Sequence, residues 1–161
     1  MDGKTVDESR TVMTQVVMPD DTNNFDNLYG GRLMDWIDTI GVIVAQRHCN
    51  KNVVTASIDS LTFIAPIKRG DIVVLEGWIN YTGHTSMEVE VRVTAENPRE
   101  RTKTEACSVY LTYVAVDKDL KPSPIPPLIL RTDEERRRFE EAKERKIARL
   151  KLKSEALKHK R

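Results

Sequence analysis

The sequence predicts an α+β domain in which a five-stranded antiparallel sheet wraps around one long helix. One amphipathic helical pattern follows Gly30 and Gly31, and five runs rich in β-branched residues flank it. Short loops join the last four runs, which favours antiparallel pairing. A single helix cannot cover both faces of such a sheet, so we expect the outer face to be wet or to contact another subunit.

The helix is expected to run from Gly30 to about Arg47. Its apolar residues recur every three or four positions and share one face: Leu33, Ile37, Ile40, Gly41 and Val44. So wide an apolar face indicates burial against the sheet. Glycine inside a helix costs about 1 kcal/mol relative to alanine, so Gly41 indicates a close approach of the helix backbone to a neighbour.

The strands are expected at residues 10–18, 53–64, 71–81, 86–96 and 104–116. The fourth alternates between apolar residues and charged or polar ones, as a strand with one wet face does. The Pro-rich segment 118–127 is expected to be extended.

A charged helix is expected at the C-terminal end, and Thr132 with Glu135 forms a capping box at its start. Its basic residues indicate either contact with an anionic ligand or a solvated helix packed over a neighbouring surface. We therefore expect a domain at residues 8–120, followed by a Pro-rich linker and charged helix at residues 121–161.

Composition argues against several classes of function. The chain has 161 residues and a formal net charge of +1, which gives no bulk electrostatic reason to bind nucleic acid. Cys49 and Cys107 belong to no CxxC pair, which indicates reduced thiols rather than a zinc site or a disulfide framework. No apolar run is long enough for a membrane helix, and no secretory signal is visible. We expect a cytoplasmic protein with neither nucleic-acid nor membrane partners.

The common motifs of nucleophilic, nucleotide-binding and metal-dependent enzymes do not occur. The sequence has no GxSxG, GxGxxG or Walker loop. Its three histidines, His48, His84 and His159, are not spaced as metal ligands. Cys49 directly follows His48, but adjacent residues on a helix do not face each other.

Three features remain: the Asn/Asp-rich loop at residues 20–29, the glycine pair Gly30-Gly31, and Asp38. Free N–H groups and the helix dipole at the glycine pair can polarise a carbonyl oxygen, although the pair also fits an ordinary turn. Asp38 lies at the border of the apolar helix face, where a carboxylate needs a partner or a cleft. Position alone leaves both a functional and a structural aspartate open.

A long part of the sequence resembles a known family. The stretch PDDTNNFDNLYGGRLMDWIDTIGVIVAQRHCN resembles the start of the brain-type and bacterial acyl-CoA thioesterases of the hotdog fold. The stretch NVVTASIDSLTFIAPIKRGDIVVLEGWINYTGHTSMEVEV continues the resemblance, as do TYVAVD, the Pro-rich turn and EERRRFEEAKER. The resemblance implies the hotdog fold and hydrolysis of fatty acyl-CoA to a free carboxylic acid and CoA.

The family pattern implies roles for three residues. Asn23 matches the catalytic asparagine, with Asn24 and Asn27 as neighbouring alternatives, and Asp38 matches the catalytic acid. Gly31 matches the glycine whose N–H points at the thioester carbonyl. Asp38 would act as a general base on water or as a nucleophile that forms an anhydride. No metal or cofactor is needed, because a thioester is already activated and CoA is a good leaving group.

The family also implies a homodimer that assembles into a trimer of dimers, a homohexamer, with Asn23 of one subunit working with Asp38 of the other. Acyl-CoA is the expected substrate. Candidate contacts to acyl-CoA come from the glycine pair, the end of the helix, a tunnel for the acyl chain, one basic turn and one hairpin turn. They are Gly30, Arg47, His48, Phe63, Lys68, Gly83, His84, Thr85 and Ser86.

Two alternatives stay open. The first is a hydratase or dehydratase of the same fold, which usually relies on a catalytic histidine in or near the central helix. The second is a non-catalytic module that senses acyl-CoA or a nucleotide. The sequence does not indicate the acyl chain length.

Overall fold

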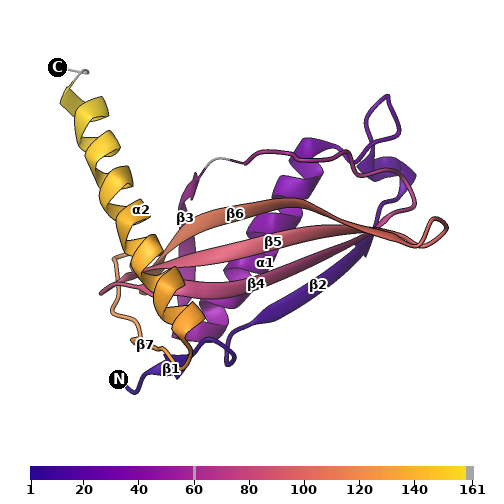
Figure 1. Ribbon diagram of the computed structural model, residues 1–161. Helices are drawn as coiled ribbons and strands as arrows, with labels where there is room; N and C mark the ends of the chain where they lie inside the picture. Colours follow the sequence, from indigo (N-terminus) through magenta and orange to yellow (C-terminus); the bar gives the residue numbers. More distant parts are fainter. Residues whose placement is uncertain (60, 159–161) are drawn as a thin grey trace.

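A five-stranded antiparallel sheet wraps around one central helix in the computed structural model, which describes residues 1–59 and 61–158 (Figure 1). The strand order is β2-β4-β5-β6-β3. The elements are β2 (Thr11–Val16), α1 (Gly30–Cys49), β3 (Asn52–Asp59), β4 (Ile72–Thr82), β5 (Ser86–Asn97) and β6 (Thr102–Val116). The predicted fold class is confirmed.

The central helix α1 begins and ends close to the predicted residues. Tyr29 is the extended residue before it, and Asn50 ends it in the left-handed conformation, with a φ of 53°. The apolar face of α1 packs against inward-facing residues of the three central strands, all of which are fully buried: Val73, Leu75, Val89, Val91, Val93 and Leu111. The apolar positions of the alternating pattern at residues 86–96 therefore mark the face of the sheet that covers the helix.

The close approach predicted at Gly41 is that of the helix backbone to Tyr113, whose hydroxyl oxygen lies nearest to the position of a Cβ atom at residue 41. A Cβ atom at residue 41 would lie 2.9 Å from Cζ and 3.0 Å from Cε2 of the Tyr113 ring. Any other side chain would therefore displace the tyrosine, which explains a glycine inside the helix.

The predicted strand at residues 53–64 is wrong at its C-terminal end, because β3 ends at Asp59. Asp59 is the last residue of β3 that pairs with β6, opposite Tyr110, and the chain then leaves the sheet. It approaches β6 again where the Ile64 N–H donates to Ala106 O at 3.0 Å. The apolar residues that follow β3 line a groove, and their composition is like that of a strand. The sequence pattern therefore did not distinguish this segment from the strand. Residue 60 of this predicted strand and residues 159–161 of the predicted C-terminal helix lie outside the described residues.

Three short elements were not predicted, because they span too few residues to show a period. β1 (Lys4–Thr5) pairs in parallel with β7 (Leu128–Ile129), and η1 (Pro19–Asp21) opens the Asn/Asp-rich loop.

The charged helix α2 (Asp133–Lys158) begins with the predicted capping box. The Glu135 N–H donates to Thr132 Oγ1 at 3.1 Å, and the Thr132 N–H donates to Glu135 Oε2 at 3.1 Å. The first part of α2 crosses the outer face of the sheet, and its later part extends past the sheet (Figure 1). This packing agrees with the interpretation of the basic segment as a solvated helix packed over a neighbouring surface.

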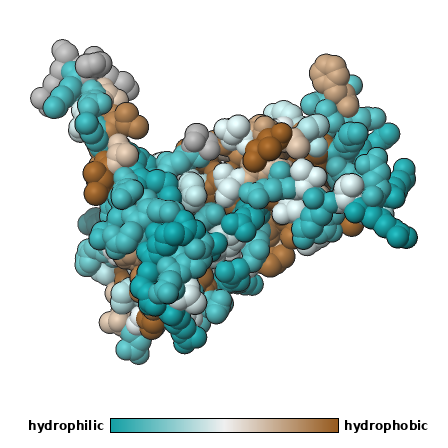
Figure 2. Space-filling model, in the orientation of Figure 1, coloured by the Kyte–Doolittle hydropathy of each residue, from teal (hydrophilic) through white to brown (hydrophobic). Residues whose placement is uncertain are grey.

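Side chains of α2 hold it on the sheet. The ring centroids of Phe139 and Tyr81 are 4.9 Å apart, and Arg145 forms an ion pair with Glu88 at 2.7 Å. Figure 2 shows mainly hydrophilic residues over the packed part of α2, with apolar residues exposed toward its end: Ile147, Leu150, Leu152 and Leu157. Within the described residues, neither helix combines the length and the apolar composition needed to cross a membrane.

Candidate active site

Asp38 lies on the flank of α1 that faces β3 and β6, and it is half-buried. Two hydroxyl groups donate to the same carboxylate oxygen: Thr55 Oγ1 lies 2.9 Å from Asp38 Oδ1, and the Tyr113 hydroxyl oxygen also lies 2.9 Å from it. No described group donates to the other oxygen, Oδ2. The position at the border of the apolar face is therefore as predicted, and the carboxylate has partners on one oxygen only.

Sequence reasoning missed Thr55 and Tyr113 as neighbours of Asp38. Thr55 is an exposed residue of the edge strand β3, and Tyr113 is fully buried on β6. Burial and the nearby Asp38 carboxylate raise the pKa of Tyr113 far above its ordinary value, so the phenol stays protonated. The only signal in the sequence was Gly41, whose missing side chain makes room for the tyrosine ring.

Asn23 organises the loop before α1. Its Oδ1 accepts the N–H of Phe25 at 2.9 Å and that of Asn27 at 3.3 Å, which is an Asx-type turn. The Asn23 side chain is exposed, and its amide NH₂ has no hydrogen-bond partner among the described residues. The loop thus fixes the oxygen of this amide and leaves the donor end free.

The start of α1 presents free backbone donors. The Arg32 and Leu33 N–H groups donate to Tyr29 O, whereas within the described chain no backbone acceptor pairs with the N–H of Gly30 or Gly31. Tyr29 provides no side-chain cap. A Cβ atom at Gly31 would lie 2.7 Å from Cε1 of the Tyr29 ring, so glycine lets this ring lie close to the helix start.

An apolar groove of about 320 Å³ opens beside the helix start. Phe63 covers one side of it, with its Cζ 3.5 Å from a Cβ built at Gly30. The groove is lined by the end of the loop before α1, by the start of α1 and by the segment that follows β3: Asn27, Leu28, Gly30, Leu33, Phe63, Ile64, Ala65, Pro66 and Ile67. Such a lining suits an acyl or alkyl group.

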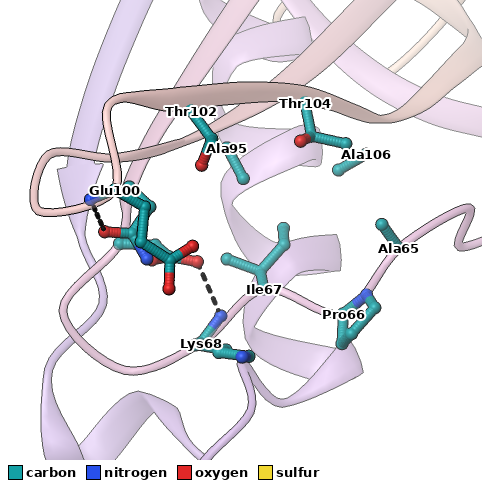
Figure 3. A pocket seen from close by; sticks show the side chains of 11 residues that line it. Ala65, Pro66, Ile67, Lys68, Ala95, Glu100, Thr102, Thr104 and Ala106 are labelled. Carbon is teal, nitrogen blue, oxygen red and sulfur yellow. Dashed lines mark hydrogen bonds between the residues drawn. The ribbon is translucent and has the colours of Figure 1, made fainter.

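A second, smaller pocket of about 130 Å³ lies on the other side of the segment 65–67, which the two pockets share. Figure 3 shows Ile67 in this pocket, between Lys68 and residues at the end of β5 and the start of β6. Lys68 forms an isolated β-bridge with Asn27, so this predicted contact residue lies beside the Asn23 loop.

The other predicted contact residues do not lie at this end of the helix. Arg47 is in the last turn of α1, about 24 Å from Gly31 at 1.5 Å per residue, and its guanidinium donates to Thr11 Oγ1 at 2.9 Å. His48 is fully buried, with Nε2 2.9 Å from Pro126 O, and burial lowers its pKa. A contact between His48 and CoA stays a prediction, and in the single chain this side chain has no exposed surface.

The hairpin turn formed by Gly83, His84, Thr85 and Ser86 joins β4 to β5 and packs against the Pro-rich segment. The Ile125 N–H donates to His84 O at 3.0 Å. His84 itself is exposed. In one chain this turn is therefore separate from the group formed by Asn23, Gly30, Gly31, Phe63 and Lys68.

The described residues contain no cluster of three or more His, Cys, Asp or Glu side chains suited to a metal ion. Both cysteines are buried thiols. Burial raises the pKa of Cys49 and raises that of Cys107 to about 11, which makes either one a poor nucleophile at neutral pH.

Comparison with known proteins identifies the family. Residues 25–102 match the model of the thioesterase superfamily. An uncharacterised acyl-CoA thioester hydrolase of Bacillus subtilis is 44% identical over 128 residues, which cover 80% of this chain and 74% of the relative. The chain belongs to the thioesterase superfamily. A mouse cytosolic acyl coenzyme A thioester hydrolase is 37% identical over 88% of this chain, which spans only 38% of that longer relative.

Solved structures agree with this family and with the predicted hotdog fold. A hexameric acyl-CoA thioesterase in its apo form has a TM-score of 0.90 and 42% identity, with 94% of this chain and 97% of that chain covered. The acyl-CoA hydrolase of Staphylococcus aureus, in complex with butyryl-CoA, CoA and CoA disulfide, has a TM-score of 0.87 and 35% identity, with 97% of both chains covered. Alanine variants of that hydrolase at one aspartate, one asparagine and one threonine are also known as structures.

Proposed function

We propose that this thioesterase-superfamily protein hydrolyses acyl-CoA to a carboxylic acid and CoA, with Asp38 as the general base. The observation that carries the proposal is the half-buried Asp38 carboxylate, which two hydroxyl donors hold by Oδ1. Its free Oδ2 can accept a proton from water that attacks the thioester carbonyl. The residue types changed in the S. aureus variants are those of Asp38, Asn23 and Thr55.

The start of α1 is the proposed oxyanion site. As water attacks, negative charge develops on the thioester oxygen, and the Gly31 N–H would donate to it there. One such donor contributes about 3 kcal/mol in the transition state. The Asn23 NH₂ would donate to the same oxygen or orient the water. The CoA thiolate then leaves as the carbonyl reforms, so the reaction needs no cofactor.

Two subunits complete one site in this proposal. Asp38 and Gly31 are seven residues apart on α1, about 10 Å along the helix axis. Groups that act on one carbon lie within about 3.5 Å of the reacting atoms, so one chain cannot easily supply both. β3 carries Thr55 and is an open edge of the sheet, able to pair with the same strand of a second copy.

We propose that such dimers assemble into a trimer of dimers, in line with the hexameric relative. Lys68 and the partner's hairpin turn at residues 83–86 are the proposed contacts to CoA, and the groove beside Phe63 would hold the acyl chain. A cytosolic location accords with the name of the mouse relative. The hydratase alternative loses support, because His48 is buried against Pro126.

The test is release of free CoA, measured with a thiol reagent, across straight-chain acyl-CoA substrates from acetyl to palmitoyl. We expect turnover with at least one chain length and a preference that reports the size of the groove. No release from any substrate would refute the proposed function. Mixed Asn23→Ala and Asp38→Ala chains should recover part of the parental rate, whereas no recovery after proven subunit exchange would refute the shared site.

A further inference from the structure

The packing of the Tyr113 ring does not explain why this buried residue carries a hydroxyl group. The side chain has no exposed surface. A buried hydroxyl is costly unless it forms a hydrogen bond, and the Tyr113 hydroxyl oxygen is the atom nearest to the position of a Cβ at Gly41. Among the described residues, the hydroxyl is placed to donate to either of two atoms of Asp38.

The geometry favours the carboxylate over the backbone. The hydroxyl oxygen lies 2.9 Å from Asp38 Oδ1 and 3.3 Å from Asp38 O. A phenol carries one proton and donates to one acceptor at a time. The shorter bond goes to a charged group, and such bonds are the stronger ones. Because the raised pKa of Tyr113 keeps the phenol protonated, this donor persists across the working pH range.

Both donors on Asp38 use Oδ1, so the rotamer of the carboxylate is fixed with Oδ2 free. Thr55 comes from the exposed edge strand β3, whereas Tyr113 is locked between β6 and the helix. Apart from these two hydroxyls, no described ion pair or side-chain hydrogen bond reaches the Asp38 carboxylate. The tyrosine is therefore the rigid one of its two supports.

We propose that Tyr113 is a positioning residue for the thioesterase reaction, whose hydroxyl holds Asp38 Oδ1 and thereby aims Oδ2 at the attacking water. Gly41 contributes to the same arrangement, because the absence of a side chain at this residue leaves room for Tyr113. The inference rests on the proposed hydrolysis of acyl-CoA.

The test compares Tyr113→Phe with the parent on the best acyl-CoA substrate. We expect kcat to fall about 10- to 100-fold, the range for loss of a hydrogen bond to a charged group. KM should change less than about threefold, because Tyr113 does not touch the substrate. The acid limb of the kcat profile should move to higher pH, because the ionised carboxylate loses a donor.

Tyr110→Phe is the matched control, since Tyr110 lies on the same strand but faces Arg145 across the outer side of the sheet. It should retain the parental kcat and pH profile. Gly41→Ala is the second variant, because it keeps both hydroxyl and carboxylate but displaces the ring; it should show the same selective loss of kcat.

Folded Tyr113→Phe or Gly41→Ala enzyme with parental kcat and an unmoved acid limb would overturn the inference. So would a loss of melting temperature in either variant with no shift of the profile. A parent that releases no CoA would instead refute the proposed function, which separates the two failures.

Discussion

Replacing Arg145 with methionine should loosen α2 from the outer face of the sheet. The guanidinium contacts both carboxylate oxygens of Glu88, at 2.7 Å for the closest pair and 3.2 Å for the others. It also lies 3.7 Å from the centroid of the Tyr110 ring. The methionine keeps most of the apolar stem but leaves Glu88, 2% exposed, with Asn80 at 3.5 Å as its one remaining side-chain donor among the described residues.

Removing one partner of a buried ion pair costs about 3–5 kcal/mol. Because 23% of the Arg145 side chain is exposed, we expect a smaller loss, about 2–3 kcal/mol. For a chain of this size that loss lowers the melting temperature by about 4–12 °C. The protein concentration is held constant, because oligomerisation contributes to apparent stability.

The loss should depend on pH. Burial holds the pKa of Glu88 above its ordinary value, while Arg145 opposes this rise. The folded state therefore binds the Glu88 proton more tightly than the unfolded chain, and stability falls as pH rises from the unfolded pKa toward the folded one. Removing Arg145 raises the folded pKa further, so the deficit should be larger near pH 7 than near about pH 5.

Thermal unfolding followed by circular dichroism measures this effect. The control is Lys143→Met on the same helix, where an exposed ion pair with Glu140 at 3.3 Å is removed; it should change the melting temperature little. An Arg145→Met protein that melts like the parent, or whose deficit is larger at acid pH, would refute the account of α2 docking.

Two further predictions concern Asn23 and His48. Asn23→Asp keeps the oxygen that accepts two backbone N–H groups but loses the NH₂ donor, so kcat should fall about 10- to 100-fold with little change in melting temperature; a parental kcat would contradict the proposed role. Burial lowers the pKa of His48, so its contribution to stability is present above the unfolded pKa and is lost as pH falls. His48→Gln cannot take up that proton, so its stability deficit relative to the parent should shrink from about pH 7 to about pH 5; a deficit that grows on acidification would contradict this sign.

Much of the fold could be predicted because its elements carry clear periods. The alternation in β5 and the helical spacing in α1 both arise from burial against the same core, so each pattern reports its own element. The end of β3 at Asp59 could not be predicted, because the chain stays apolar where it leaves the sheet to line the groove. β1 and β7 span two residues each and show no period.

The site was predictable only where it is local. Gly31 and Asp38 lie on one helix, and the resemblance covers that helix and the loop before it. The hydrogen-bond partners of Asp38 are Thr55 and Tyr113, which are 17 and 75 residues away in the sequence. The periodicity of apolar residues does not indicate such long-range contacts. The hydrogen bond between His48 and Pro126 could not be predicted for the same reason, because the two residues are 78 positions apart.

The central claim is that Asp38 provides the base for thioester hydrolysis. The most direct measurement is the kcat of Asp38→Asn, with Asp35→Asn as the control on the exposed side of the same helix. An amide of the same shape can keep the hydrogen-bonded geometry but cannot take a proton from water. We predict that Asp38→Asn loses at least about 100-fold in kcat while Asp35→Asn stays near the parent. An Asp38→Asn protein that releases CoA at the parental rate would contradict the account.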